Sequence, residues 1–107
     1  MSSQDLALLY TTFKDNEQAE KLTKVLLEKK LIACANFFDI KSLYRWEGEI
    51  ASQNEVGCLL KTSSSQSDAL KTYLLTHHPY DVPCLINLHH SNFNPAFLSW
   101  VVAETQD

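Results

Sequence analysis

The chain has 107 residues, of which 45% are hydrophobic and 21% are charged, and these are ordinary values for a single globular domain. Thirteen acidic residues against nine basic ones give a net charge of −4, and the longest basic cluster is Lys29 with Lys30. This balance argues against a nucleic-acid-binding protein and against a surface that docks on anionic lipid.

The N-terminal sequence and the cysteines predict the cellular compartment. The first residues show no basic leader, and their apolar run is too short for a signal peptide or a membrane span. Cys34, Cys58 and Cys84 are odd in number, widely spaced and set in apolar runs, so we expect free buried thiols rather than a disulfide framework. Together these features predict a cytoplasmic protein.

A strand and a helix open the chain. "LALLYTTF", residues Leu6–Phe13, is a short apolar and β-branched run that predicts a buried strand. Asp15 and Gln18 have the spacing of a helix capping box, and apolar residues then recur at helical intervals. This pattern predicts a helix over residues 15–30.

A long hairpin is predicted next. Residues 31–38 and 40–46 have strand composition, and Asp39 between them predicts a bulge or a bend. Gly48 in "WEGE" predicts the hairpin tip at residues 47–49. Alternation along the return strand predicts one face with Val56, Cys58, Leu60 and Thr62 and another with Glu55, Gly57, Leu59 and Lys61.

The second half of the chain repeats this order. Ser65 and Asp68 have capping-box spacing for a second helix, which should end at Pro79 because the residue before proline leaves the helical region. Residues 84–90, "CLINLHH", predict a fourth strand, and the Asn-Pro pair at residues 94–95 predicts the start of a short terminal helix. The stripe of the second helix that we expect to be buried is Ala69, Leu70, Tyr73 and Leu74.

The order of these elements predicts one α+β domain over residues 1–107. Two similar halves in tandem fit a ferredoxin-like βαββαβ arrangement, with both helices on one face of an antiparallel sheet and a short C-terminal helix added. The hairpin strands are longer than a small sheet can cover, and they carry Tyr44 and Trp46 near the tip. We therefore expect an oligomer that covers the hairpin.

Five segments carry a family resemblance over nearly the whole chain. They are "VLLEKKLIACAN", "SLYRWEGEI", "NEVGCLLKT", "HHPYDVP" and "FLSWV", in this order. In this order and spacing the chain resembles the CutA family of divalent-cation tolerance proteins. The resemblance implies a ferredoxin-like fold in a tight homotrimer whose long hairpins pair across subunits. It also implies binding of copper or another divalent metal and a role in metal tolerance.

The chain departs from the family pattern at two positions that bear on a metal site. The family often has a cysteine before its first-strand threonine, where this chain has Tyr10 before Thr11. The proline of "DVP" is usually followed by glutamate, and here Cys84 follows it. A copper site built from that family cysteine and the histidine pair therefore does not carry over intact.

The adjacent residues His77 and His78 are the candidate metal ligands. Neighbouring side chains lie about 100° apart on a helix, so two adjacent imidazoles rarely bind one ion without further ligands. The alternative is a helix C-terminal pair, with one ring facing solvent and the other packed against Tyr80. We expect His78 to matter more for binding than His77. His89 and His90 should end the fourth strand on opposite faces.

A cleft between subunits is the second candidate site. Glu55 and Lys61 share a face of one strand, and the resemblance places the "HPY" segment against a neighbouring subunit's sheet. A carboxylate, an ammonium and an imidazole in a partly apolar cleft suit a small anion or a metal chelate. The alternative is interface packing and ordinary surface charge. The predicted cleft residues are Tyr44, Trp46, Glu55, Lys61, Tyr80 and Cys84.

These features predict a homotrimeric CutA-like protein that binds a divalent metal, with copper favoured, weakly and without an obligatory cofactor. The alternative is a trimeric sensor or adaptor, similar to PII-type signalling proteins, that binds a small ligand at the intersubunit cleft. No catalytic constellation supports an enzyme, and two glycines are too few for a phosphate-binding loop.

Overall fold

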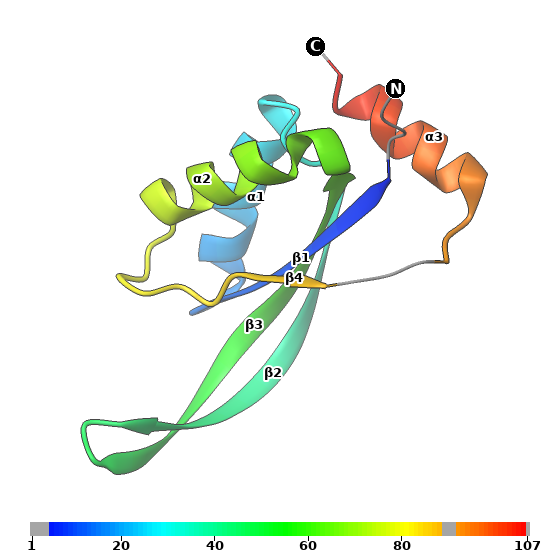
Figure 1. Cartoon of the computed structure of the whole chain (residues 1–107). Helices are drawn as coiled ribbons and strands as arrows, with labels where there is room; N and C mark the ends of the chain where they lie inside the picture. The colour runs from blue at the N-terminus through cyan, green and yellow to red at the C-terminus, as the bar shows by residue number, and fades with distance from the viewer. Residues whose placement is uncertain (1–4, 89–91, 107) are drawn as a thin grey trace.

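A computed structural model describes residues 5–88 and 92–106 of the chain. Its sheet has the strand order β2-β3-β1-β4, and every neighbouring pair of strands is antiparallel. This order confirms the predicted ferredoxin-like α+β fold with a short helix at its C-terminal end. The elements in Figure 1 are β1 (Leu6–Phe13), α1 (Asn16–Glu28), β2 (Cys34–Trp46), β3 (Glu49–Ser63), η1 (Ser64–Gln66), α2 (Ser67–His77), β4 (Ile86–Leu88) and α3 (Pro95–Glu104).

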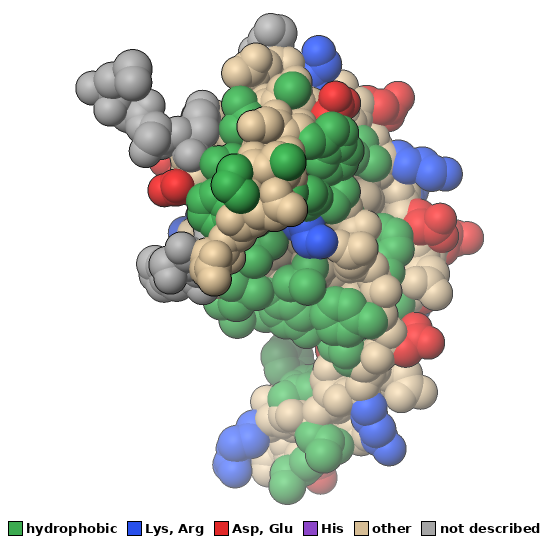
Figure 2. Space-filling view, turned by 90° about the vertical axis from the view of Figure 1, so that its right-hand side faces the viewer, with side chains coloured by type: hydrophobic (Ala, Val, Ile, Leu, Met, Phe, Trp, Pro, Cys, Tyr) green, Lys and Arg blue, Asp and Glu red, His purple; other side chains and the backbone are tan. Residues whose placement is uncertain are grey.

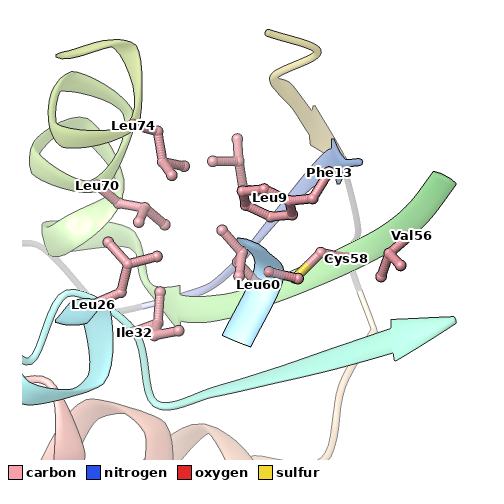
Figure 3. Close-up of a cluster of buried hydrophobic side chains, with 10 residues drawn as sticks. Leu9, Phe13, Leu26, Ile32, Val56, Cys58, Leu60, Leu70 and Leu74 are labelled. Atoms are coloured by element: carbon pink, nitrogen blue, oxygen red, sulfur yellow. The ribbon is translucent and has the colours of Figure 1, made fainter. Parts of the chain in front are cut away.

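The main core lies between the sheet and the helices α1 and α2, which cover the same face of it (Figure 1). The alternation of β3 is confirmed, because the side chains of Val56, Cys58, Leu60 and Thr62 are all buried. Figure 3 shows how leucines of the two helices point toward this row and toward β1. The buried members are Leu9, Phe13, Ala19, Leu26, Ile32, Val56, Cys58, Leu60, Leu70 and Leu74.

The helix α3 belongs to a smaller cluster at one end of the opposite sheet face. Val101 packs there with Leu6 and Ala33. The Lys61 ammonium lies over the ring of Phe97, with Nζ 5.7 Å from the ring centroid. Neither α1 nor α2 covers this face of the sheet, and we call the whole of it the open face.

The structure corrects the prediction of an interruption at Asp39. The register of β2 against β3 runs without a break through Phe38↔Gly57, Asp39↔Val56 and Ile40↔Glu55. The strand also begins at Cys34 rather than at residue 31. Leu31 instead closes α1, since its N–H donates to the Leu26 carbonyl at 2.9 Å.

The Asp15 half of the capping box of α1 is confirmed, while the Gln18 side chain accepts from the Lys14 N–H at 3.1 Å instead of that of Asp15. The capping box predicted for α2 is wrong. Asp15 accepts a hydrogen bond from the Gln18 N–H at 2.9 Å. At α2 the N-cap is Gln66 rather than Ser65, after one turn of 3-10 helix. The Gln66 side chain donates instead to the Lys30 and Thr105 carbonyls, which ties three chain segments together.

The buried stripe of α2 is narrower than predicted. Leu70 and Leu74 are buried and Tyr73 is partly buried, but Ala69 is exposed. The helix ends before Pro79 as predicted, and Asn94 caps α3 by accepting from the Ala96 N–H at 2.8 Å. The predicted positions of His89 and His90 lie outside the described residues.

Candidate functional site

The candidate site lies on the open face of the sheet. Even-numbered residues of β2 pair with odd-numbered residues of β3, so their side chains point to the same face. Ile40 pairs with Glu55, and Tyr44 pairs with Ala51. The register therefore places four of the predicted cleft residues on this face, namely Tyr44, Trp46, Glu55 and Lys61.

A hydrogen bond joins Glu55 to Tyr80. The Tyr80 hydroxyl donates to the Glu55 Oε2 at 2.7 Å, although the two residues are 25 positions apart. The partial burial of the phenol raises the pKa of Tyr80, and the bond and negative charge of Glu55 raise it further. Tyr80 is therefore protonated at neutral pH and acts as a donor to the carboxylate.

Tyr10 and Cys84 complete this group. Burial raises the pKa of the Cys84 thiol, and the charge of Glu55 adds to the effect. Burial also raises the pKa of Tyr10, with additional contributions from Cys84 and Glu55. Both groups are thus protonated near neutral pH and lie within electrostatic reach of the carboxylate. We call Tyr10, Glu55, Tyr80 and Cys84 the Glu55 cluster.

His78 is buried behind this cluster, with 8% of its surface exposed. Its Nε2 lies 2.9 Å from the Thr12 carbonyl, and its Nδ1 accepts the Tyr80 backbone N–H at 3.0 Å. The ring stacks on Phe13 with 4.7 Å between centroids, and it lies 5.0 Å from the Tyr80 ring. Because Nδ1 accepts, the proton of the neutral ring sits on Nε2, and burial lowers the pKa of His78.

His77 points to different partners. It is exposed, its Nδ1 lies 3.0 Å from the Tyr73 carbonyl, and its ring stacks on Tyr73 with 3.9 Å between centroids. The ring lines a groove between α1 and α2 of about 360 Å³. The structure thus turns the two adjacent histidines toward different layers of the fold, as the spacing of neighbouring helical residues requires.

The remaining predicted residues are spread along the open face. Lys61 is six residues from Glu55 along β3, roughly 20 Å at the usual rise of a strand. Tyr44 donates its hydroxyl to Gln53 Oε1 at 2.6 Å, and Trp46 is 63% exposed near the hairpin tip. Within one chain, the structure therefore brings together Glu55, Tyr80 and Cys84 but leaves Lys61 and Trp46 apart.

A hollow of about 520 Å³ lies beside Glu55 and was not predicted from the sequence. Lys14 and Lys41 line it together with Asp39 and Glu55. These residues come from the β1–α1 turn and from both strands of the hairpin, so no local pattern marks them as one group. Glu55 was predicted to line a cleft, but Lys14, Asp39 and Lys41 have only the sequence pattern of ordinary exposed charges.

The described residues form neither a ready-made metal centre nor a membrane-spanning helix. Within residues 5–88 and 92–106, no three His, Cys, Asp or Glu side chains gather into a ready-made metal centre. Among the described helices, none is long and apolar enough to cross a membrane.

Comparisons with known proteins agree with the fold. A protein of Pyrococcus horikoshii named divalent-cation tolerance protein CutA is 43% identical over 94% of this chain and 99% of its own. The crystal structure of CutA1 from Ehrlichia chaffeensis has a TM-score of 0.93 at 40% identity, covering 98% of this chain and 99% of its own.

A third relative is described with a different cellular location from the one that we predicted. The structure of CutA from Archaeoglobus fulgidus has a TM-score of 0.90 at 33% identity, covering 95% of this chain and 100% of its own, and that protein is described as periplasmic. This does not fit a family confined to the cytoplasm, so the cytoplasmic location stays a prediction for this chain. The model of the CutA1 divalent ion tolerance protein family matches residues 7–104. The chain belongs to the CutA1 family of divalent ion tolerance proteins.

Proposed function

We propose that this protein is a cytoplasmic homotrimer that binds divalent metal, with copper favoured, and acts in tolerance to metal ions. The observation that carries the proposal is the Glu55 cluster, in which the Tyr80 hydroxyl bonds to the carboxylate of Glu55 and the Cys84 thiol lies within electrostatic reach of that carboxylate. The relatives are named divalent-cation tolerance proteins, and this supports the cellular role.

The assembly is supported by the apolar surface that one chain leaves uncovered. Figure 2 shows hydrophobic side chains gathered in a band above the hairpin. Contiguous apolar surface of this kind usually marks an interface, and the family resemblance supplies the expectation of three subunits. The large exposed hydrophobic residues of the hairpin and β4 are Phe38, Leu43, Tyr44, Trp46, Ile50, Ile86 and Leu88.

The ligands in one subunit favour borderline-soft cations. Carboxylate oxygen and thiolate sulfur together suit copper and zinc better than magnesium or calcium, which prefer oxygen-only ligand sets. Cys84 must lose its proton to bind, so affinity should fall with decreasing pH. Ligation by His78 would require one of its two hydrogen bonds to break. Two protein ligands with water fit a weak and exchangeable site.

Light scattering and calorimetry test the proposal together. We expect a mass of three chains at micromolar concentration, and measurable binding of zinc, used as a redox-silent probe, without binding of magnesium. Glu55→Gln should weaken zinc binding, whereas Asp39→Asn, the same charge change on the other face of the hairpin, should not. A stable monomer, or equal affinity for zinc and magnesium, would contradict the proposal.

A PII-like sensor is the second candidate, and one observation favours it. The hollow beside Glu55 carries two cationic side chains, Lys14 and Lys41, among three carboxylates, Asp15, Asp39 and Glu55, so its lining matches a small ligand that presents both anionic and cationic groups. Calorimetry with a panel of nucleotides distinguishes the two functions, because tight nucleotide binding without zinc binding would favour the sensor.

A further inference from the structure

The segment between α2 and β4, residues 78–85, brings Tyr80 and Cys84 to Glu55 without helix or strand structure of its own. A segment without regular hydrogen bonding needs side chains to fix its path. Within it, the ring of His78 makes bonds in two directions, one to the sheet and one to the segment itself.

The bond to the sheet is long-range. The Nε2–H of His78 donates to the Thr12 carbonyl near the end of β1, 66 residues earlier in the chain. The ring lies nearly parallel to Phe13, with an interplanar angle of 8°, so packing fixes its plane as well. His78 is thereby anchored to β1.

The second bond sets the position of Tyr80. The Tyr80 backbone N–H donates to His78 Nδ1 at 3.0 Å, and the Tyr80 hydroxyl reaches Glu55 Oε2 at 2.7 Å. The imidazole therefore links β1 to the residue that contacts the carboxylate on β3. A group held from two sides in this way is preorganised for binding.

We propose that His78 is a positioning residue that places Tyr80 on Glu55, and that it is not itself a metal ligand. Both of its ring nitrogens are engaged, since the Nδ1 lone pair accepts from Tyr80 and Nε2 carries the proton that faces Thr12. The cation-binding consequence rests on the proposed function, but the positioning role does not.

Two substitutions, each of which keeps only one of the two hydrogen bonds of His78, separate a positioning role from a role as metal ligand. In His78→Asn the amide oxygen can occupy the place of Nδ1 and accept from the Tyr80 N–H. In His78→Gln the amide NH₂ can reach the place of Nε2 and donate to Thr12, but no acceptor remains for Tyr80. The control is His77→Asn, which makes the same substitution at the adjacent, exposed histidine, whose ring stacks on Tyr73 of α2.

Amide hydrogen exchange measured by NMR reports directly on the hydrogen bond from the Tyr80 N–H to His78 Nδ1. We expect the Tyr80 N–H to exchange slowly in the unmodified protein, in His78→Asn and in His77→Asn. In His78→Gln its exchange should be roughly tenfold faster, as the loss of one hydrogen bond predicts. Equal exchange in His78→Asn and His78→Gln would overturn the positioning role, whether or not the protein binds a cation.

Zinc calorimetry then separates positioning from ligation. A positioning role predicts that His78→Asn keeps its affinity within about twofold, while His78→Gln and Tyr80→Phe both lose roughly tenfold. Loss of affinity in His78→Asn, with the Tyr80 N–H still protected, would make His78 a ligand and overturn the proposal. Absence of zinc binding in the unmodified protein would overturn the proposed function and leave the exchange result to decide on His78.

Discussion

At the scale of single residues, the core contains buried threonine hydroxyl groups that make no hydrogen bond with the described residues. The Oγ1 atoms of Thr11 and Thr62 are buried, and neither has a hydrogen-bond partner among the described residues. A buried hydroxyl without a partner costs free energy, and valine has nearly the same shape. We expect Thr62→Val to raise the free energy of unfolding by about 1 kcal/mol, measured by urea denaturation.

Thr105 provides the matched control for this prediction. It is also buried, but its hydroxyl donates to the Val101 carbonyl at 2.9 Å and lies 3.0 Å from Ser63 Oγ. Thr105→Val should therefore lower the free energy of unfolding, by about 1 kcal/mol. The same sign of change in both variants would refute the explanation.

His78 makes the stability of the protein depend on pH. Burial lowers its pKa in the folded state, so the unfolded chain binds more protons as the pH falls below about 6.5. The free energy of unfolding should then decrease as the pH is lowered from 7 to 5.5. His78→Asn removes this titration, and its stability should fall less over the same interval in urea denaturation at each pH. An equal loss in both proteins would show that other groups cause it.

At the scale of elements, the hairpin turn depends on two left-handed residues. Glu47 has φ of 49° and Gly48 has φ of 80°, as a two-residue turn between right-twisted strands requires. A Cβ on Gly48 would meet nothing within 4 Å, so the cost of a side chain there is conformational. Gly48→Ala should lower the free energy of unfolding by about 1 kcal/mol.

Glu47→Asn tests the same turn in the opposite direction. Asparagine adopts left-handed backbone more readily than glutamate, so this variant should be slightly more stable than the unmodified protein. Thermal unfolding of both variants under the same conditions should show a lower melting temperature for Gly48→Ala and a higher one for Glu47→Asn. If Gly48→Ala leaves the melting temperature unchanged, the hairpin tip does not limit stability.

At the scale of the whole molecule, an oligomer should make thermal stability depend on concentration. Association stabilises the folded state by mass action, so the melting temperature should rise between 1 and 100 μM protein, as order-of-magnitude limits. Trp46→Lys places a charge on the exposed hairpin and should remove most of this rise. The control is Leu75→Lys, at a site that is 60% exposed on α2, outside the open face. Equal effects of both variants would count against a hairpin interface.

The sequence predicted the elements better than their ends. The order of strands and helices follows from local periodicity, and the Asp15 and Asn94 caps follow from side chains that bond within three residues. Asp39 suggested a bulge because it interrupts an apolar run, yet it sits in regular register opposite Val56. A strand tolerates a charged side chain that points to solvent. Which way the side chain points depends on the pairing with the neighbouring strand, and the local sequence does not show that pairing.

The sequence by itself determined the ferredoxin-like fold, the family and the place of His78 at the end of a helix, because these depend on local patterns and their order. The tertiary structure decided what His78 does. Its two partners, Thr12 and Tyr80, lie 66 residues before it and two residues after it, and only the docking of α2 on β1 brings the ring to that carbonyl. The pairing of Glu55 with Tyr80 depends in the same way on the register of β3 in the sheet, because a shift of one residue would turn the carboxylate to the other face.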